Sequence, residues 1–132
     1  MKLHWPMQLH GGGYSVRSFI HIQDVVRATL QLAKEGEPGS TWHLSTKESC
    51  SIRDLVEQIC EQTSADFKAL VQNSEDRLGK DQSYLLDSTS IRQRHGWSDQ
   101  ISLQQGLQET LEWVDANLAT LKNLPWNYQH KT

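Results

Sequence analysis

Basic and acidic side chains in two separate stretches of this sequence have the clearest potential for chemistry. Arg17 lies in SVRSFIH, between a glycine turn and an apolar segment, while Arg77 and Lys80 lie beside two aspartates in DRLGKD, residues 76–81. A guanidinium can hold a phosphate through two parallel hydrogen bonds, and a carboxylate can accept from ribose hydroxyls. Both stretches could therefore serve an anionic ligand, although each alone is also typical of a solvated surface.

The glycine run Gly11–Gly13 invites comparison with phosphate-binding loops, but its spacing does not support one. Neither GxGxxG nor GxxxxGK[ST] occurs in the sequence, so a turn with positive φ angles is the better interpretation. The six histidines include no pair at HExxH spacing and have no CxxC partner, which argues against a metal site. No GxSxG motif supports a Ser/His/Asp triad, so nucleophilic hydrolysis is set aside.

Length, composition and charge exclude several classes of protein. The 132 residues, of which 36% are hydrophobic and which carry a net charge of -3, suffice for one compact domain but not for a two-lobed nucleotide-dependent enzyme. The acidic balance gives no field that would attract nucleic acid or anionic lipid, and no apolar run approaches the roughly 20 residues that span a membrane. Cys50 and Cys60 are too few for a disulfide-built secreted domain, so we expect reduced thiols and a cytoplasmic protein.

The first third of the chain has the pattern strand, helix, strand. Residues 18–22 alternate in polarity and predict a short extended segment, and TWHLS at residues 41–45 is typical of a buried strand. Between them, apolar residues recur at helical spacing from residue 22 to residue 33. Asp24 is expected to cap this helix, and Gly36 is expected to end it.

The middle of the chain predicts a second helix and another strand. Ser51 and Asp54 have the spacing of a capping box, and they precede an apolar stripe over residues 52–60. Apolar side chains then alternate with polar ones in residues 67–71, which favours a short strand before the charged loop.

The last part of the chain is predicted to be helical. A short helix should follow YLLD and end at Gly96. Ser102, with Gln105 three residues later, should cap a long amphipathic helix. Together these patterns predict one α/β unit that is helix-rich and has a few short strands.

The order of these pieces resembles the C-terminal portion of extended short-chain dehydrogenase/reductases. The resemblance covers roughly residues 5–118 and is greatest to nucleotide-sugar 4,6-dehydratases and 4-epimerases, with dTDP-glucose 4,6-dehydratases first. It implies a single partial domain over residues 1–120, in which residues 1–50 complete the Rossmann layer with its last helix and strand. Residues 51–120 would then form the substrate-binding lobe, and residues 121–132 a C-terminal arm. The matching pieces are PMQLHGGGYSVRSFIHIQDVVRATLQLAKEG, TWHLS, DRLGKD, YLLDSTSIRQRHGW and SLQQGLQETLEW.

The resemblance also implies where a nucleotide-diphosphate sugar would bind. Arg17 occupies the place where these enzymes hold the diphosphate with an arginine, and Arg77 would be its partner. The segment Gln8–His10 would lie along the nucleotide base, and Asp81 or its loop would reach the ribose. The implied substrate-binding residues are Gln8, Leu9, His10, Arg17, Arg77 and Asp81.

Two features of the family are missing from this sequence. The family binds NAD through a glycine-rich fingerprint and transfers hydride beside a Tyr-x-x-x-Lys pair, whereas the residues four positions after the three tyrosines are two serines and a threonine. His43 stands where the dehydratases commonly have asparagine, and we assign it no catalytic role. We therefore expect a fragment, or the product of a truncated reading frame, that binds a nucleotide-diphosphate sugar, holds no cofactor of its own and does not turn over alone.

The missing lobe leaves two expectations about partners. A separate Rossmann lobe would have to bring NAD and the proton-transfer residues. Alternatively, the chain is a self-associating assembly module without ligand-binding activity, because an orphaned helix face with Val25, Val26 and Leu30 would seek a partner.

Overall fold

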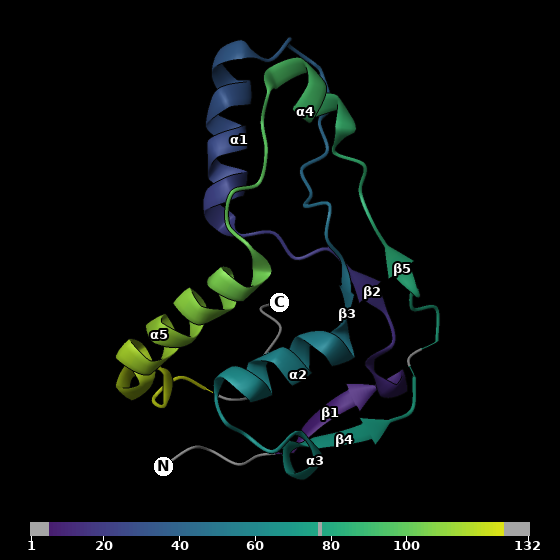
Figure 1. Cartoon of the computed structure of the whole chain (residues 1–132), viewed down its shortest axis with the longest axis vertical. Helices are drawn as coiled ribbons and strands as arrows, with labels where there is room; N and C mark the ends of the chain where they lie inside the picture. Colours follow the sequence, from purple (N-terminus) through teal and green to yellow (C-terminus); the bar gives the residue numbers. More distant parts are fainter. Residues whose placement is uncertain (1–5, 77, 126–132) are drawn as a thin grey trace.

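The structure is a computed structural model that describes residues 6–76 and 78–125. One end of the molecule holds α1 and α4, the other end holds β1, β4, α2 and α3, and β2, β3 and β5 lie between them, with α5 to one side (Figure 1). In chain order the elements are β1 (Met7–His10), the 3-10 turn η1 (Gly11–Gly13), β2 (Val16–Arg17), α1 (Ile22–Glu35), β3 (Cys50–Ser51), α2 (Ile52–Gln62), α3 (Phe67–Leu70), β4 (Val71–Ser74), β5 (Ser83–Tyr84), α4 (Thr89–His95) and α5 (Leu103–Leu121).

The strands form two small sheets, and each of them contains one parallel pair of strands. In the first sheet, β1 pairs in parallel with β4, from Met7 opposite Val71 to His10 opposite Ser74. In the second, β2 lies between β3 and β5, antiparallel to β3 and parallel to β5. The chain therefore passes from β1 to β2 beside a second stretch that passes from β4 to β5.

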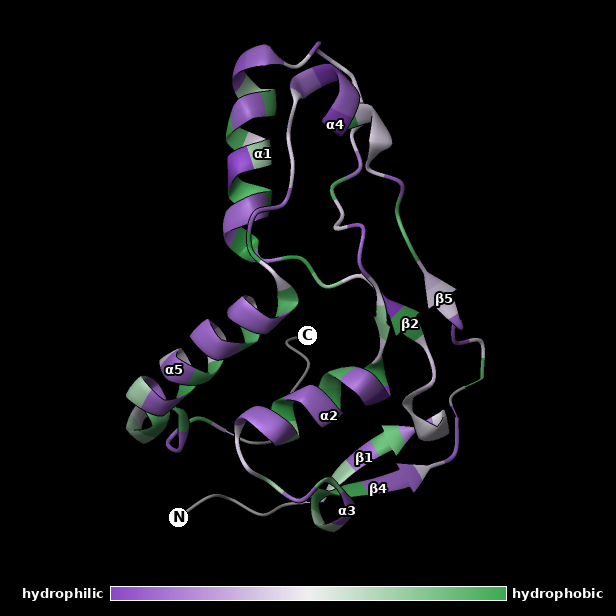
Figure 2. Ribbon diagram, in the orientation of Figure 1, coloured by the Kyte–Doolittle hydropathy of each residue, from purple (hydrophilic) through white to green (hydrophobic). Residues whose placement is uncertain are grey.

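Two small apolar clusters form the core. The first lies between β1 and α2, whose side chains form it. The second lies where α1, α4 and the segment before α5 meet. Apolar residues recur along both α1 and α2, the helices that contribute to these clusters (Figure 2). The buried members are Leu9, Val56 and Cys60 in the first cluster, and Ala28, Ile91 and Trp97 in the second.

At α2, α4 and α5, local signals place a helix end where the sequence predicts it. The Ser51 hydroxyl accepts from the Asp54 amide and the Asp54 carboxylate accepts from the Ser51 amide, which confirms the capping box of α2. Gly96 ends α4 in the left-handed conformation with φ 62°, as a C-terminal glycine does. The Ser102 hydroxyl accepts from the Gln105 amide and caps α5.

The predicted cap of α1 is wrong. His21 caps this helix, because its Nδ1 accepts from the Gln23 amide. Asp24 is instead the third helical residue, and its fully buried carboxylate accepts from the backbone amides of Gln100 and Ile101. A contact across 76 residues has thus taken the side chain that local sequence assigns to the helix end.

Two predicted strands are also wrong. Residues 41–45 form no strand, because no strand in the described part of the chain pairs with them, and a strand is stable only beside a neighbour. Phe67–Leu70 is a helical turn, since the Asp66 carboxylate accepts from the Lys68 amide and starts it, and β4 begins only afterwards.

In the N-terminal part of the chain, the strands lie at other residues than the sequence predicts. The predicted extended segment covers residues 18–22, but the strand β2 lies just before it, at Val16–Arg17. Helix α1 already begins at Ile22, the last residue of the predicted segment. Strand β1, Met7–His10, is absent from the elements predicted above. Its four residues alternate in polarity too briefly to signal a strand, and its partner β4 lies 64 residues away.

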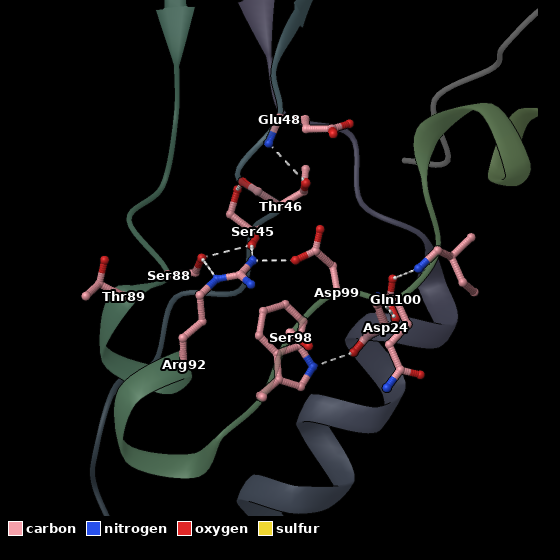
Figure 3. Close-up of polar contacts among 12 residues, drawn as sticks. Asp24, Ser45, Thr46, Glu48, Ser88, Thr89, Arg92, Ser98, Asp99 and Gln100 are labelled. Carbon is pink, nitrogen blue, oxygen red and sulfur yellow. Dashed lines mark hydrogen bonds and ion pairs between the residues drawn. The ribbon is translucent and has the colours of Figure 1, made fainter.

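Arg92 in α4 joins three segments at the end of the molecule that holds α1 and α4 (Figure 3). Arg92 donates through Nε to the Ser88 hydroxyl at 3.0 Å, and through Nη2 to the Ser45 carbonyl at 2.8 Å and the Asp99 carboxylate at 2.5 Å. Its guanidinium also lies 5.0 Å from the Trp97 ring centroid. Burial alone would raise the pKa of Asp99, but the hydrogen bonds to its carboxylate, from Arg92 first and then from Thr46, together with the Arg92 charge, lower this pKa below its ordinary value.

The Asp24 carboxylate joins α1 to the start of α5. It accepts from the amides of Gln100 and Ile101, each at 3.1 Å, and forms an ion pair with Arg27. Burial alone would raise the pKa of Asp24, but the hydrogen bonds from Arg27 and from the two amides prevail, so this pKa lies below its ordinary value of 3.8. The ionised carboxylate therefore stabilises the fold.

We predict that Asp24→Asn lowers the free energy of unfolding by roughly 2–4 kcal/mol near pH 7, because it removes a buried charge that three donors share. Since the pKa of Asp24 is lower in the folded state, its contribution is complete above the ordinary value of 3.8 and is lost as the pH falls through the folded pKa. Urea denaturation should show the difference between the two proteins narrowing below about pH 4.

Asp115→Asn, on the exposed side of α5, is the matched control and should change stability by less than about 0.5 kcal/mol. A difference between wild type and Asp24→Asn that stays constant into the acidic range would contradict the assigned role of the Asp24 charge.

Candidate functional site

The predicted site residues lie where two distant stretches of chain run side by side. Residues 10–17 carry the chain from β1 to β2, and residues 74–76 and 78–82 belong to the stretch from β4 to β5. The parallel pairs β1–β4 and β2–β5 hold both ends of these stretches together. We call the contact between them the loop–turn junction.

Side chains around His10 connect the two stretches at the end of β1. His10 Nδ1 lies 2.9 Å from the Ser74 hydroxyl and 3.3 Å from the Glu75 carbonyl oxygen. Lys80 Nζ donates to the His10 carbonyl at 3.2 Å and to the Asp76 carboxylate at 2.9 Å. The backbone end of β1 is thus fixed by a cation that comes from the opposite stretch.

Arg17 makes the corresponding connection at β2. Its Nη2 donates to the Asp81 carbonyl at 2.9 Å and its Nη1 to the Val16 carbonyl at 2.7 Å. The Val16 amide also donates to the Gln82 carbonyl at 2.8 Å. These contacts use two of the five N–H donors of the guanidinium, and they fix its plane at the junction.

The glycine turn is packed by the protein's own side chains. All three residues of Gly11–Gly13 have positive φ angles of 57–75°, which confirms the predicted turn. A Cβ on Gly11 would lie 2.3 Å from the Asp76 carboxyl carbon, and one on Gly13 would lie 2.8 Å from the Leu9 side chain. Because a carboxylate and a leucine fill this space, the turn does not fit the phosphates of a dinucleotide such as NAD.

Arg53 holds the turn from the side of α2. Its Nε donates to the Gly12 carbonyl at 3.0 Å and its Nη2 to the Asn73 side chain at 3.3 Å. The guanidinium also lies 5.5 Å from the Tyr14 ring centroid and 5.3 Å from that of Phe67. The sequence analysis missed this residue, since these partners are up to 41 residues away and leave no local pattern.

The segment predicted to lie along a base has one buried and two exposed residues. Gln8 is exposed, and its Nε2 donates to the Gln72 side chain at 3.0 Å. Leu9 is only 3% exposed and packs in the first core cluster, so it can offer a ligand no more than backbone atoms. His10, the third residue, belongs to the junction.

The structure thus brings together three of the six predicted residues, His10, Arg17 and Asp81, at the loop–turn junction. Gln8 is adjacent to them on β1. Arg77 lies outside the described residues, so its predicted place opposite Arg17 remains a prediction.

A cleft with a volume of about 710 Å³ lies away from this junction. None of the described site residues lines it. Its walls carry the carboxylates of Glu48 and Asp99, which do not favour an anionic ligand. Cys50 also lines it, and burial raises the pKa of this thiol, with a smaller contribution from the Asp54 charge. A protonated thiol is a weak nucleophile, so the cleft does not suggest covalent catalysis.

Other chemistries find no support in the part of the chain that the structure describes. There, no group of three or more histidine, cysteine or acidic residues could hold a metal ion. Neither is any helix of that part long and apolar enough to cross a membrane. Cys50 and Cys60 are both free thiols, as predicted.

The fold matches the C-terminal region of dehydratases and epimerases of the short-chain dehydrogenase/reductase type. A crystal structure of the dTDP-glucose 4,6-dehydratase DesIV from Streptomyces venezuelae, with NAD and TYD bound, superposes with a TM-score of 0.83 at 28% identity over 88% of this chain and 36% of that one. The UDP-glucose 4-epimerase from Thermotoga maritima, with UDP-glucose, gives a TM-score of 0.78 at 27% identity over 86% and 36%.

Sequence comparison gives the particular family. A family model described as GDP-mannose 4,6 dehydratase matches residues 2–110, so the chain belongs to this family. A dTDP-glucose 4,6-dehydratase of Streptomyces niveus is 32% identical over 111 residues, which are 84% of this chain and 33% of that protein. A trifunctional UDP-glucose 4,6-dehydratase/UDP-4-keto-6-deoxy-D-glucose 3,5-epimerase/UDP-4-keto-L-rhamnose-reductase of Arabidopsis thaliana is 30% identical over 111 residues, 84% of this chain and 16% of that protein.

These matches confirm the resemblance and its α/β fold. They also show that the chain spans only about a third of the length of the dTDP-glucose dehydratases, and less of the trifunctional relative.

We predict that Gly13→Ala lowers the free energy of unfolding by roughly 1–3 kcal/mol, because it adds backbone strain and a collision with the buried Leu9 side chain. Gly39→Ala is the matched control, since Gly39 has a φ of 80° but no atom within 4 Å of the added Cβ, and it should cost about 1 kcal/mol. Thermal or urea denaturation measures both. Equal losses in the two variants would show that Leu9 does not limit the turn.

Proposed function

We propose that this chain is the nucleotide-sugar-binding part of an NAD-dependent nucleotide-sugar dehydratase or epimerase, and that it does not turn over alone. Arg17 and Arg77 would hold the diphosphate, residues 8–10 would contact the base, and Asp81 or its neighbours would bind the ribose. The observation that carries this proposal is the loop–turn junction, where Arg17 meets the Asp81 backbone next to the exposed end of β1.

The orientation of the Arg17 side chain suits a diphosphate. The Arg17 guanidinium is fixed by two backbone carbonyls, and a planar group with a fixed orientation loses little freedom when it binds an oxyanion in a bidentate manner. Arg77 joins the proposed site on sequence grounds. The ligand class is supported by solved relatives with TYD or UDP-glucose bound.

Two features of the chain's own residues support the proposed absence of turnover. No tyrosine in the sequence is followed four positions later by lysine, so the Tyr-x-x-x-Lys pair beside which this family transfers hydride is missing from this sequence. The glycine turn, filled by Asp76 and Leu9, does not fit NAD. A separate lobe would therefore bring the cofactor and the groups that move protons, and without that lobe binding should be weak, on the order of millimolar.

Isothermal titration calorimetry with dTDP-glucose and UDP-glucose tests the binding. We predict that the double variant Arg17→Ala, Arg77→Ala weakens binding at least tenfold, because it removes two charge-assisted hydrogen-bonding groups of about 1.5–3 kcal/mol each. Lys34→Ala, which removes an exposed cation at the end of α1, should leave the affinity unchanged. Arg17→Lys keeps the charge and controls for folding. Unchanged heats in the double variant would refute the proposed diphosphate site.

A second candidate function, self-association, is favoured by one face of α1. Ile22, Val26 and Leu30 follow each other at helical spacing and are 66%, 47% and 58% exposed. Val25, which the sequence analysis placed on the same face, is half-buried. A groove of about 660 Å³ beside this stripe is lined by Ile22, Val26 and residues of α5. A continuous apolar stripe of this kind is typical of an interface.

Light scattering at high micromolar concentration tests the assembly. If α1 mediates it, the wild-type chain should be larger than a monomer, and Val26→Glu with Leu30→Glu should return it to a monomer because buried charge opposes the contact. Leu124→Glu, at another exposed leucine, should leave the size unchanged. A wild-type chain that remains a monomer at these concentrations excludes this second function.

A further inference from the structure

We propose that Lys80 is a positioning residue for Arg17, because its ammonium group fastens the segment Lys80–Gln82 to the end of β1. The inference rests on the proposed function, in which Arg17 binds the diphosphate. Lys80 itself need not touch the ligand. Its role is to fix the backbone carbonyl that orients the Arg17 guanidinium.

Two acceptors hold the Lys80 ammonium group in place. Its Nζ donates to the His10 carbonyl at 3.2 Å and to the Asp76 carboxylate at 2.9 Å. The Lys80 side chain is only 18% exposed, whereas that of Asp76 is 56% exposed. A lysine side chain that is mostly buried and has both a carboxylate and a carbonyl as acceptors is held in place more firmly than a solvated surface lysine.

The path from Lys80 to Arg17 is short. Asp81 follows Lys80 directly, and its carbonyl accepts from Arg17 Nη2 at 2.9 Å. One residue later, the Gln82 carbonyl accepts from the Val16 amide at 2.8 Å. If the ammonium released the His10 carbonyl, the two carbonyls that hold β2 and its guanidinium would lose their anchor to β1.

The Asp76 carboxylate also packs closely against the glycine turn. The Asp76 carboxylate, which Lys80 holds, lies over Gly11 where a Cβ would be only 2.3 Å from its carboxyl carbon. Lys80, Asp76 and the glycine turn are therefore packed as one unit. A neutral side chain at position 80 would leave the Asp76 charge without this partner and would weaken the contact.

Hydrogen exchange measured by NMR tests the positioning directly, without any ligand. In the full chain with Lys80→Met, the Val16 amide should exchange about tenfold faster than in wild type, because the segment that accepts from it is released. The Val56 amide in α2 should be unaffected. Lys80→Arg, which keeps the cation and its donors, should restore Val16 protection, and Lys34→Met should have no effect. Unchanged exchange of Val16 in Lys80→Met would overturn the proposal.

Titration with dTDP then links the positioning to binding. Lys80→Met should weaken dTDP binding about tenfold in wild type, yet have little effect when Arg17→Ala is already present, because both changes act through one group. Equal losses in the two backgrounds would refute a role through Arg17. A wild-type chain that binds no dTDP would refute the proposed function, while the exchange of Val16 would still decide what Lys80 does.

Discussion

The parallel pairing of β1 with β4 is the constraint on which the candidate site depends. In this register Leu9 faces the first core cluster and His10 lies opposite Ser74. Because side chains alternate along a strand, a slip of one residue would turn Leu9 toward solvent and bury a polar neighbour. One buried leucine thus fixes the position of the loop that carries Lys80 and Asp81 against the turn that precedes Arg17.

Polar contacts carry much of the arrangement because the apolar clusters are small. The second core cluster has three buried apolar members. The elements around it are joined by Asp24 and Arg92, whose partners include backbone atoms of distant segments. Buried charges stabilise a fold only when their hydrogen bonds are complete. Each group has at least one backbone partner from a distant segment, the Ser45 carbonyl for Arg92 and the amides of Gln100 and Ile101 for Asp24, so each links segments of the chain.

The sequence predicts the helices well and the strands poorly, for a physical reason. The ends of α2, α4 and α5 are set by Ser51, Gly96 and Ser102, which act within four residues of themselves. Strands of two to four residues exist only through partners elsewhere in the chain, so β1 was missed and residues 41–45 were wrongly taken for a strand.

The candidate site shows the same division. Arg17 and Asp81 could be singled out because their stretches of sequence match a family pattern. The positions of the Lys80 and Arg53 side chains could not be predicted. The hydrogen bonds that fix them join residues 70 and 41 positions apart in the sequence.

The surroundings of Trp97 have a consequence for spectroscopy. Its indole is 4% exposed, donates to the Asp24 carbonyl and lies beneath the Arg92 guanidinium, whereas Trp113 on α5 is 57% exposed. Iodide in solution reaches only an indole that is accessible to water. With iodide present, the fluorescence that survives quenching will contain the emission of Trp97, which gives this chain an intrinsic optical probe of the contact between α1 and α4.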